Sequence, residues 1–450
     1  MTKSLRNWWG RFLFQGRGIV PSKRLVTILL LLSVSIIILT VVGLDWIWII
    51  TFNSLFLLFS LVDLLFSPKK KEMNFTREIP HELERGLQYQ VQIKVRNTSD
   101  YGCSLTLVDD VPQSFRKTFP IKGKLKKECN FTYDIEAPVR GDYYLRHLYV
   151  RYASPLGLWE KQMTIPLEDH VKVIPDLTET RRYLQSAQQF LLYDGEKIRK
   201  QKSGVGEFAR IRNYVVGDDP RKINWRQTAK LQEVMTNEYE PEHGKYITIL
   251  IDCGRMMGAE LKDGNRLEKS LEAALTVTAA ALKNGDYVGV LVFSKDVNVF
   301  IPPAKGMDQL QRILQAIYNV KVDATESNYS AVMNYLQTYQ KKRSLLLLFS
   351  DVHTFLYEES ALYYFKRLRQ RHLFFMIGIE DDELNTTAKQ DTRNVHHTMV
   401  KSMAQQQLLF KKREIAKWEK QGLIMVEATE EQLATVAVSY YINLLNEGLL

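Results

Sequence analysis

The residues best suited to chemistry are two aspartates that end predicted strands. Asp252 closes the apolar run Tyr246–Asp252, and Asp351 closes the run 344–351. In a parallel α/β sheet, ligands bind at the carboxyl ends of the strands, so both carboxylates are expected to face one crevice. Mg²⁺ prefers oxygen ligands of this kind. Further oxygens could come from a neighbouring loop, at Thr325, Ser327 and Asn328.

A second candidate for chemistry is Cys253, which follows Asp252 directly. A nucleophilic thiol needs a partnered base, and the spacing of the histidines implies none, since His396 and His397 stand alone before a predicted helix. The sequence contains no P-loop, HExxH or GxSxG motif. We therefore predict no catalytic residue, no cofactor and no enzymatic activity. A metal- or thiol-dependent enzyme that uses the Asp252–Cys253 loop is the alternative.

The elements that must position these residues follow from hydrophobic patterning after residue 245. Continuous apolar runs at Tyr246–Asp252, Tyr287–Phe293, 344–351, Leu373–Ile379 and 423–427 alternate with amphipathic helices. Such runs are typical of strands that are covered on both faces, and the alternation predicts a doubly wound parallel sheet over 246–450. A long helix near 396–421 is expected to expose Lys411, Lys412 and Arg413 to solvent, and a last helix is expected near 430–448.

Two other regions precede this α/β domain. Residues 74–176 read as short alternating segments punctuated by prolines, which predicts a small antiparallel β-sandwich. Residues 177–245 are polar and irregular and are interpreted as a connecting segment.

The N-terminal region predicts a membrane anchor. Residues 25–44 are uncharged and 46–66 are nearly so, which favours a transmembrane helical hairpin after a basic tail over 1–24. The formal net charge is +10, but most of it flanks these two runs, so nucleic-acid binding is not expected. Because both outer flanks are basic and the turn is not, both termini and all soluble domains are predicted to be cytoplasmic, in a two-pass protein of the inner membrane.

One polar stretch, 206–225, carries a long motif. It resembles the signature of a bacterial membrane-anchored family, the domain of unknown function number fifty-eight, with Asn224 where an aspartate is common. The matching positions are Glu207, Phe208, Arg212, Tyr214, Gly217, Asp218, Asp219, Pro220, Arg221, Ile223 and Trp225.

This resemblance implies a von Willebrand factor A-like C-terminal domain. In intact domains of that type a DxSxS motif adds two hydroxyls to the aspartates, but here Gly254 and Met256 stand in place of the serines. A magnesium site is therefore expected to be degenerate, with Asp252 and Asp351 as its remnants. We hypothesise that Arg255 pairs with one of these aspartates and replaces the charge of the cation.

The role of the signature itself stays open between two interpretations. In the first, Asp218 and Asp219 pair with Arg212 and Arg221, while Phe208 and Trp225 pack the segment against the α/β domain. In the second, the segment is a partner surface.

The resemblance also implies a partner, a MoxR-type AAA+ ATPase. We therefore expect a membrane-tethered adaptor that acts in the assembly or maturation of other proteins. A membrane scaffold that self-associates through the β region is a further alternative.

Overall fold

The computed structural model describes residues 18–41, 43, 45–99, 101–193, 207–240, 244–357, 359–391 and 394–446. The chain divides into two compact units, Met1–Ile174 and Pro175–Leu450. Most of the predicted basic tail, residues 1–17, lies outside the described residues.

The first unit begins with two helices, α2 (Lys23–Val41) and α3 (Trp46–Leu65), which cover most of the two predicted spans. Among the described residues, one segment, Ile50–Glu72, is long and apolar enough to cross a membrane. The end of the predicted tail is not free: β1 (Gly18–Pro21) pairs antiparallel with β10 (Trp159–Ile174).

The predicted β-sandwich is present between Met73 and Ile174, as two sheets around one core. One sheet has the order β1-β10-β9-β5-β7, with β3 beside β10, and the other has the order β2-β4-β8-β6. The remaining elements of this unit are η1 (Lys70–Glu72), β2 (Met73–Glu78), β3 (Glu82–Glu84), β4 (Gln88–Asn97), β5 (Cys103–Asp109), β6 (Arg116–Lys117), β7 (Ile121–Leu125), β8 (Glu128–Glu136) and β9 (Gly141–Ala153).

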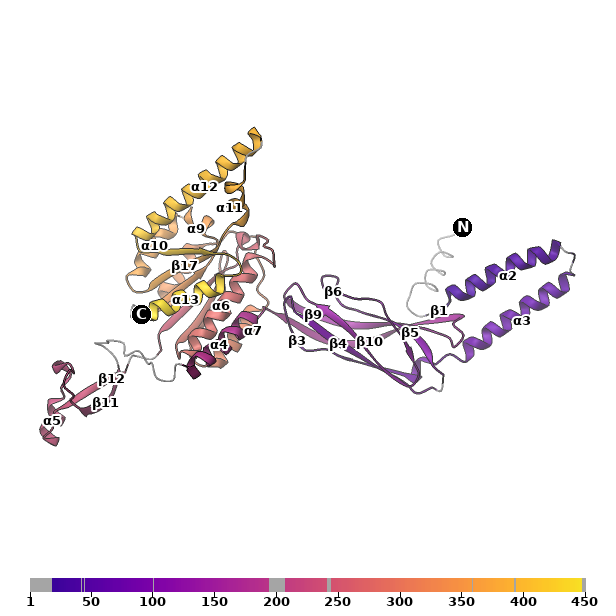
Figure 1. The fold of residues 1–450 in the computed structure, drawn as a ribbon, viewed down its shortest axis with the longest axis horizontal. Coiled ribbons are helices and arrows are strands. Elements are labelled where there is room, and N and C mark those ends of the chain that lie inside the picture. The colour runs from indigo at the N-terminus through magenta and orange to yellow at the C-terminus, as the bar shows by residue number, and fades with distance from the viewer. Residues whose placement is uncertain are drawn as a thin grey trace. The chain divides into compact units, whose positions relative to one another are not determined.

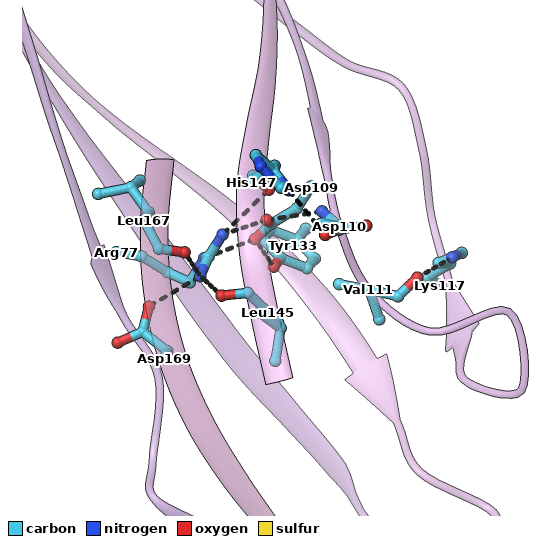
Figure 2. Close-up of polar contacts among 10 residues, drawn as sticks. All are labelled: Arg77, Asp109, Asp110, Val111, Lys117, Tyr133, Leu145, His147, Leu167 and Asp169. Atoms are coloured by element: carbon cyan, nitrogen blue, oxygen red, sulfur yellow. Dashed lines mark hydrogen bonds and ion pairs between the residues drawn. The ribbon is translucent and has the colours of Figure 1, made fainter. Parts of the chain in front are cut away.

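A buried charge cluster links the two sheets of the sandwich (Figure 2). Arg77 on β2 binds Asp109 on β5 through Nη2–Oδ1 at 2.5 Å and Nε–Oδ2 at 2.9 Å, and both side chains are fully buried. The Arg77 Nη1 also reaches Asp169 on β10 at 2.8 Å. Tyr133 on β8 donates its hydroxyl to Asp109 Oδ2 at 2.5 Å. A buried arginine is tolerated because its donors meet carboxylates and carbonyls rather than apolar groups.

The second unit holds the predicted doubly wound α/β sheet, with helices on both faces (Figure 1). Its strand order is β15-β14-β13-β16-β17-β18, and all neighbours are parallel except β14 and β15. The strands are β13 (Tyr246–Asp252), β14 (Tyr287–Phe293), β15 (Val297–Ala304), β16 (Ser344–Phe349), β17 (Leu373–Ile379) and β18 (Ile424–Ala428).

The helices of this sheet form two layers. On one face Tyr329, Phe355, Phe365 and Trp418 pack with the strands in one core. Their elements are α8 (Tyr329–Tyr339), α9 (Val352–Leu356), α10 (Glu359–Arg369) and α12 (Val395–Lys420). On the other face lie α6 (Arg266–Lys283), α7 (Met307–Ile317) and α13 (Leu433–Asn446). The short helix α11 (Asp382–Lys389) packs on α12, and η3 (Arg255–Gly258) follows β13.

One boundary and one solvent exposure in this unit differ from the sequence prediction. The helix α4 (Thr178–Tyr193) was assigned to the connecting segment, but it packs on α6, where the Thr180 and Thr276 hydroxyls lie 3.0 Å apart. It therefore belongs to the α/β domain. Lys411 on α12 is buried and pairs with Glu427, so the prediction that it faces solvent was wrong.

The signature lies in a small separate structure that we call the signature arm (207–240). It consists of the antiparallel hairpin of β11 (Glu207–Asn213) and β12 (Met235–Glu240), with η2 (Pro220–Lys222) and α5 (Trp225–Leu231) between its strands.

Candidate functional site

The carboxylate of Asp252 is enclosed by donors from its own chain. It ends β13 and is 1% exposed. Its Oδ1 accepts from Ser327 Oγ at 2.5 Å and from the Gly254 N–H at 2.8 Å. Its Oδ2 accepts from Ser350 Oγ at 2.5 Å and from the Tyr329 hydroxyl at 3.2 Å. Burial raises the pKa of this carboxyl, and the hydrogen bonds oppose that rise.

The loop oxygens expected as metal donors are used internally. Ser327 points at Asp252, and a Cβ atom on Gly254 would lie 2.1 Å from the Ser327 hydroxyl. Asn328 caps α8 by accepting from the Ala331 N–H at 3.0 Å. The Thr325 carbonyl accepts from the Arg255 N–H at 2.9 Å. Ser327 therefore fills the space that a side chain at position 254 would need.

Asp351 already has a cation of its own. Its Oδ1 pairs with Arg266 Nη1, and its Oδ2 accepts from Thr354 N at 2.9 Å and Oγ1 at 2.6 Å. The side chains of Arg266 and Asp351 are 12% and 5% exposed. The hypothesis that Arg255 replaces the cation was wrong, because Arg255 pairs with Glu326 at 3.4 Å on the surface. Arg266, the first residue of α6, supplies that charge instead.

These residues do not fit a magnesium site. Mg²⁺ demands several unengaged oxygens in octahedral geometry. Asp252 is saturated, Gly254 and Met256 offer no oxygen, and Arg266 lies against Asp351. No group of three or more histidine, cysteine or acidic side chains that could hold a metal is found in the described part of the chain.

A second internal ion pair lies at the end of β18. Lys411 from α12 binds Glu427, and burial raises the pKa of the Glu427 carboxyl while Lys411 opposes the rise. Sequence reasoning missed Lys411, although Ala404, Lys411 and Trp418 are all buried and recur every seven residues. That spacing places all three on one face of a helix.

Cys253 has the surroundings of a structural thiol. Its Sγ donates to the Phe293 carbonyl at 3.1 Å and accepts from Asn298 Nδ2 at 3.3 Å. Burial raises the pKa of this thiol to about 12, with the Asp252 charge adding to the rise. At neutral pH it is therefore a protonated thiol rather than a thiolate.

The polar residues of the signature build a turn within the arm. Arg212 forms a bidentate pair with Asp218, at 2.7 Å and 2.8 Å, as one interpretation predicted. Asp218 also accepts from the Val215 N–H at 3.0 Å, and its carbonyl accepts from the Tyr214 hydroxyl at 3.0 Å. Gly217 has φ +110°, a left-handed conformation that favours glycine.

Two other parts of that interpretation were wrong. Asp219 does not pair with the Arg221 guanidinium; it caps η2 by accepting from the Arg221 backbone N–H at 3.0 Å. Asn224 caps α5 through the Gln227 N–H at 3.1 Å, a role that aspartate and asparagine fill equally well. Trp225 is 69% exposed, so it does not pack the arm onto the α/β domain. Glu207 and Phe208 belong to β11, and their side chains lie outside the described part of the structure.

The arm instead exposes large apolar side chains. Val216 is 97% exposed and Trp225 is 69% exposed. Val215, Leu231 and Val234 are also exposed. Tryptophan and aliphatic side chains of this size gain free energy when they are removed from water.

Known proteins are similar to part of this chain. The uncharacterised protein YeaD of Bacillus subtilis (strain 168) is 25% identical over 202 residues, which are 45% of this chain and 48% of that protein. The chain thus spans about half the length of the curated relative that it matches.

Solved structures that match include the conserved hypothetical protein BatB from Bacteroides thetaiotaomicron (16% identity, 44% of this chain and 98% of that one, TM-score 0.30). Another is the SpRpn10 VWA domain (11% identity, 43% of this chain and 93% of that one, TM-score 0.28). The family described as "Protein of unknown function DUF58" matches residues 210–406. That match includes most of the signature, so the resemblance predicted from the signature is confirmed.

Proposed function

We propose that this chain is a membrane-tethered, non-enzymatic interaction protein that works on the cytoplasmic face of the inner membrane. The observation that carries the proposal is the signature arm. Its charged residues hold its own turn, while Val216 and Trp225 are left exposed. Exposed apolar side chains on a folded, hydrogen-bonded turn are what a binding partner would cover.

The tether is the N-terminal pair of helices. α3 lies in the segment that is long enough to cross a bilayer, and α2 has 19 residues and no acidic side chain. Exposed Lys23, Arg24, Lys69, Lys70 and Lys71 flank the pair at one end, which favours two passes with both termini in the cytoplasm. Protease should then digest the soluble units in inverted vesicles and spare them in intact cells shaved from outside.

The strand-end residues support a binding module over an enzyme. Asp252 and Asp351 are occupied by donors and a guanidinium from the same chain, and Cys253 is buried. The rival reading, a metal- or thiol-dependent enzyme, requires Mg²⁺ or a thiol reagent to change the melting or activity of the native protein. We expect neither to do so.

The proposed partner is a MoxR-type AAA+ ATPase, which is implied by the resemblance to DUF58 proteins. The test is affinity capture of the detergent-extracted chain under nucleotide-trapping conditions, with mass spectrometry of the captured proteins. The informative variant is Trp225→Ala. The matched control is Tyr363→Ala, since Tyr363 on α10 is 68% exposed but lies outside the arm.

Loss of the ATPase from the Trp225 variant but not from the Tyr363 variant would support the adaptor function. Absence of any ATPase from the native sample would overturn the proposed partner. Capture of further copies of this chain alone would favour the self-associating scaffold.

A further inference from the structure

The last turns of α3 are bonded to one loop of the sandwich. Asp63, two residues before the helix ends, is 3% exposed. It accepts from Ser154 Oγ at 2.5 Å, from the Leu156 N–H at 2.9 Å and from the Leu158 N–H at 3.3 Å. These donors belong to the β9–β10 loop (154–158). A buried carboxylate with three donors fixes this loop against the helix.

The same loop region holds both helices. The Trp159 Nε1–H donates to the Ser60 carbonyl at 2.9 Å and lies 2.8 Å from its hydroxyl. On the other helix, the Ser22 hydroxyl, which precedes α2, donates to the Gly157 carbonyl at 2.6 Å. The sandwich is therefore attached to the start of α2 and to the end of α3 at one level.

The length of α3 determines how deep that level lies. At about 1.5 Å per residue, its 20 residues extend about 30 Å, the thickness of the hydrocarbon core. Ser60 and Asp63 lie about 7.5 Å and 3 Å before the end of the helix at Leu65. If α3 crosses the bilayer, the loop bonded to these residues must reach the boundary between acyl chains and headgroups.

The side chains exposed at this level suit that boundary. Leu156 in the loop is 52% exposed, and Phe66 and Tyr101, each 46% exposed, pack edge to face with their rings 5.4 Å apart. Five exposed basic residues adjoin the same helix ends, at Lys23, Arg24, Lys69, Lys70 and Lys71. Exposed apolar and aromatic side chains beside lysines are typical of protein surfaces that lie in a membrane interface.

We propose that the end of the sandwich formed by the β9–β10 loop, Phe66 and Tyr101 lies in the bilayer interface, where the adjoining basic residues bind anionic phospholipid headgroups. This inference rests on the proposed membrane tether. It makes the sandwich a lipid-contacting domain that is held upright on the membrane, rather than a spacer.

The experiment attaches an environment-sensitive NBD label to a single introduced cysteine, at one of three positions, in the full chain. Cys129 is removed by Cys129→Ser, and the other native cysteines, Cys103 and Cys253, are buried. Leu156→Cys tests the loop. Val139→Cys is the matched control, because Val139 is 51% exposed and lies at the other end of β9, a strand of 13 residues or about 40 Å. Leu57→Cys, on α3, reports on the tether.

In nanodiscs, the labels at 156 and 57 should show blue-shifted emission that brominated acyl chains quench, and the label at 139 should show neither. Quenching at 57 without quenching at 156 overturns this inference and leaves the tether intact. No quenching at 57 overturns the tether itself. A blue shift at 156 that brominated lipid does not quench means that a protein covers the loop, which also overturns the inference.

The lipid charge is tested by native mass spectrometry of the full chain from discs of equal phosphatidylglycerol and phosphatidylcholine. The native chain should retain phosphatidylglycerol severalfold over phosphatidylcholine. The triple variant Lys69→Gln, Lys70→Gln and Lys71→Gln should lose most of that preference. Equal retention of both lipids by the native chain would overturn the headgroup assignment.

Discussion

The ion pair between Arg266 and Asp351 should be a main support of the α/β unit, and Arg266→Met tests it. Both side chains are nearly buried, at 12% and 5% exposed. Removing one partner of a buried pair destabilises a protein by about 3–5 kcal/mol, because the other charge is left uncompensated. Asp351 keeps two hydrogen bonds from Thr354, so we expect the lower end, about 3 kcal/mol. For a domain of this size that corresponds to a fall in Tm of about 6–12 °C.

Buried cysteines allow each unit to be followed separately. Cys253 lies in the α/β unit and Cys103 in the sandwich, and both are buried. Pulsed labelling of the full chain in detergent along a temperature ramp, with peptide mapping, gives the unfolding midpoint of each unit. Arg266→Met should lower the midpoint at Cys253 and leave that at Cys103 unchanged.

Three results would refute this reasoning. The first is a loss below about 1 kcal/mol for Arg266→Met, which would place the pair among surface ion pairs. The second is additivity of the effects of Arg266→Met and Asp351→Asn. We expect instead that the double variant is destabilised by about 1–3 kcal/mol less than the sum of the two single variants. The third is a rise in the native Cys253 midpoint with Mg²⁺, since a site that already contains its own cation gains nothing from another.

Three further predictions concern other buried groups. Arg77→Met should destabilise the sandwich by about 3–5 kcal/mol, read as a lower midpoint at Cys103, and adding Asp109→Leu should recover part of the loss. The thiol of Cys253, whose pKa is raised to about 12, should resist maleimide at pH 8 until the α/β unit unfolds. Burial lowers the pKa of His372 in the folded chain below its usual 6.5. Below pH 6.5 the unfolded chain therefore binds a proton at His372 more readily than the folded chain does, so stability falls as the pH falls. His372→Gln should flatten that dependence, and an unchanged slope would exclude His372 as its source.

Sequence patterns predicted the elements whose residues are governed by local chemistry. The Val, Ile and Leu runs of β13 and β17 have the predicted bounds, because a strand covered on both faces is apolar throughout. One of the two interpretations of the signature contained the pair between Arg212 and Asp218, which lie only six residues apart. The edge strand β15 was missed, since Pro302 and Pro303 break the usual strand pattern and are tolerated only where the ladder has a free side.

Other features depended on contacts between distant segments. The helix α4 was predicted as part of a connector, and only its packing on α6 shows that it belongs to the α/β domain. One of the two interpretations of the signature packed Trp225 against the α/β domain, but Trp225 is exposed. A side chain's solvent exposure depends on which elements meet it, and that is not encoded by its neighbours in sequence.

By itself, the sequence determined the apolar N-terminal segments, the order of the β region and α/β domain, and the DUF58 signature, because each depends on composition or on residues close along the chain. Only the tertiary structure decided that Arg266 rather than Arg255 neutralises Asp351, that Ser327 closes over Asp252, and that Asp63 binds a loop some ninety residues away. These contacts join residues far apart in sequence, and a charge can be paired by any partner that folding brings within about 4 Å.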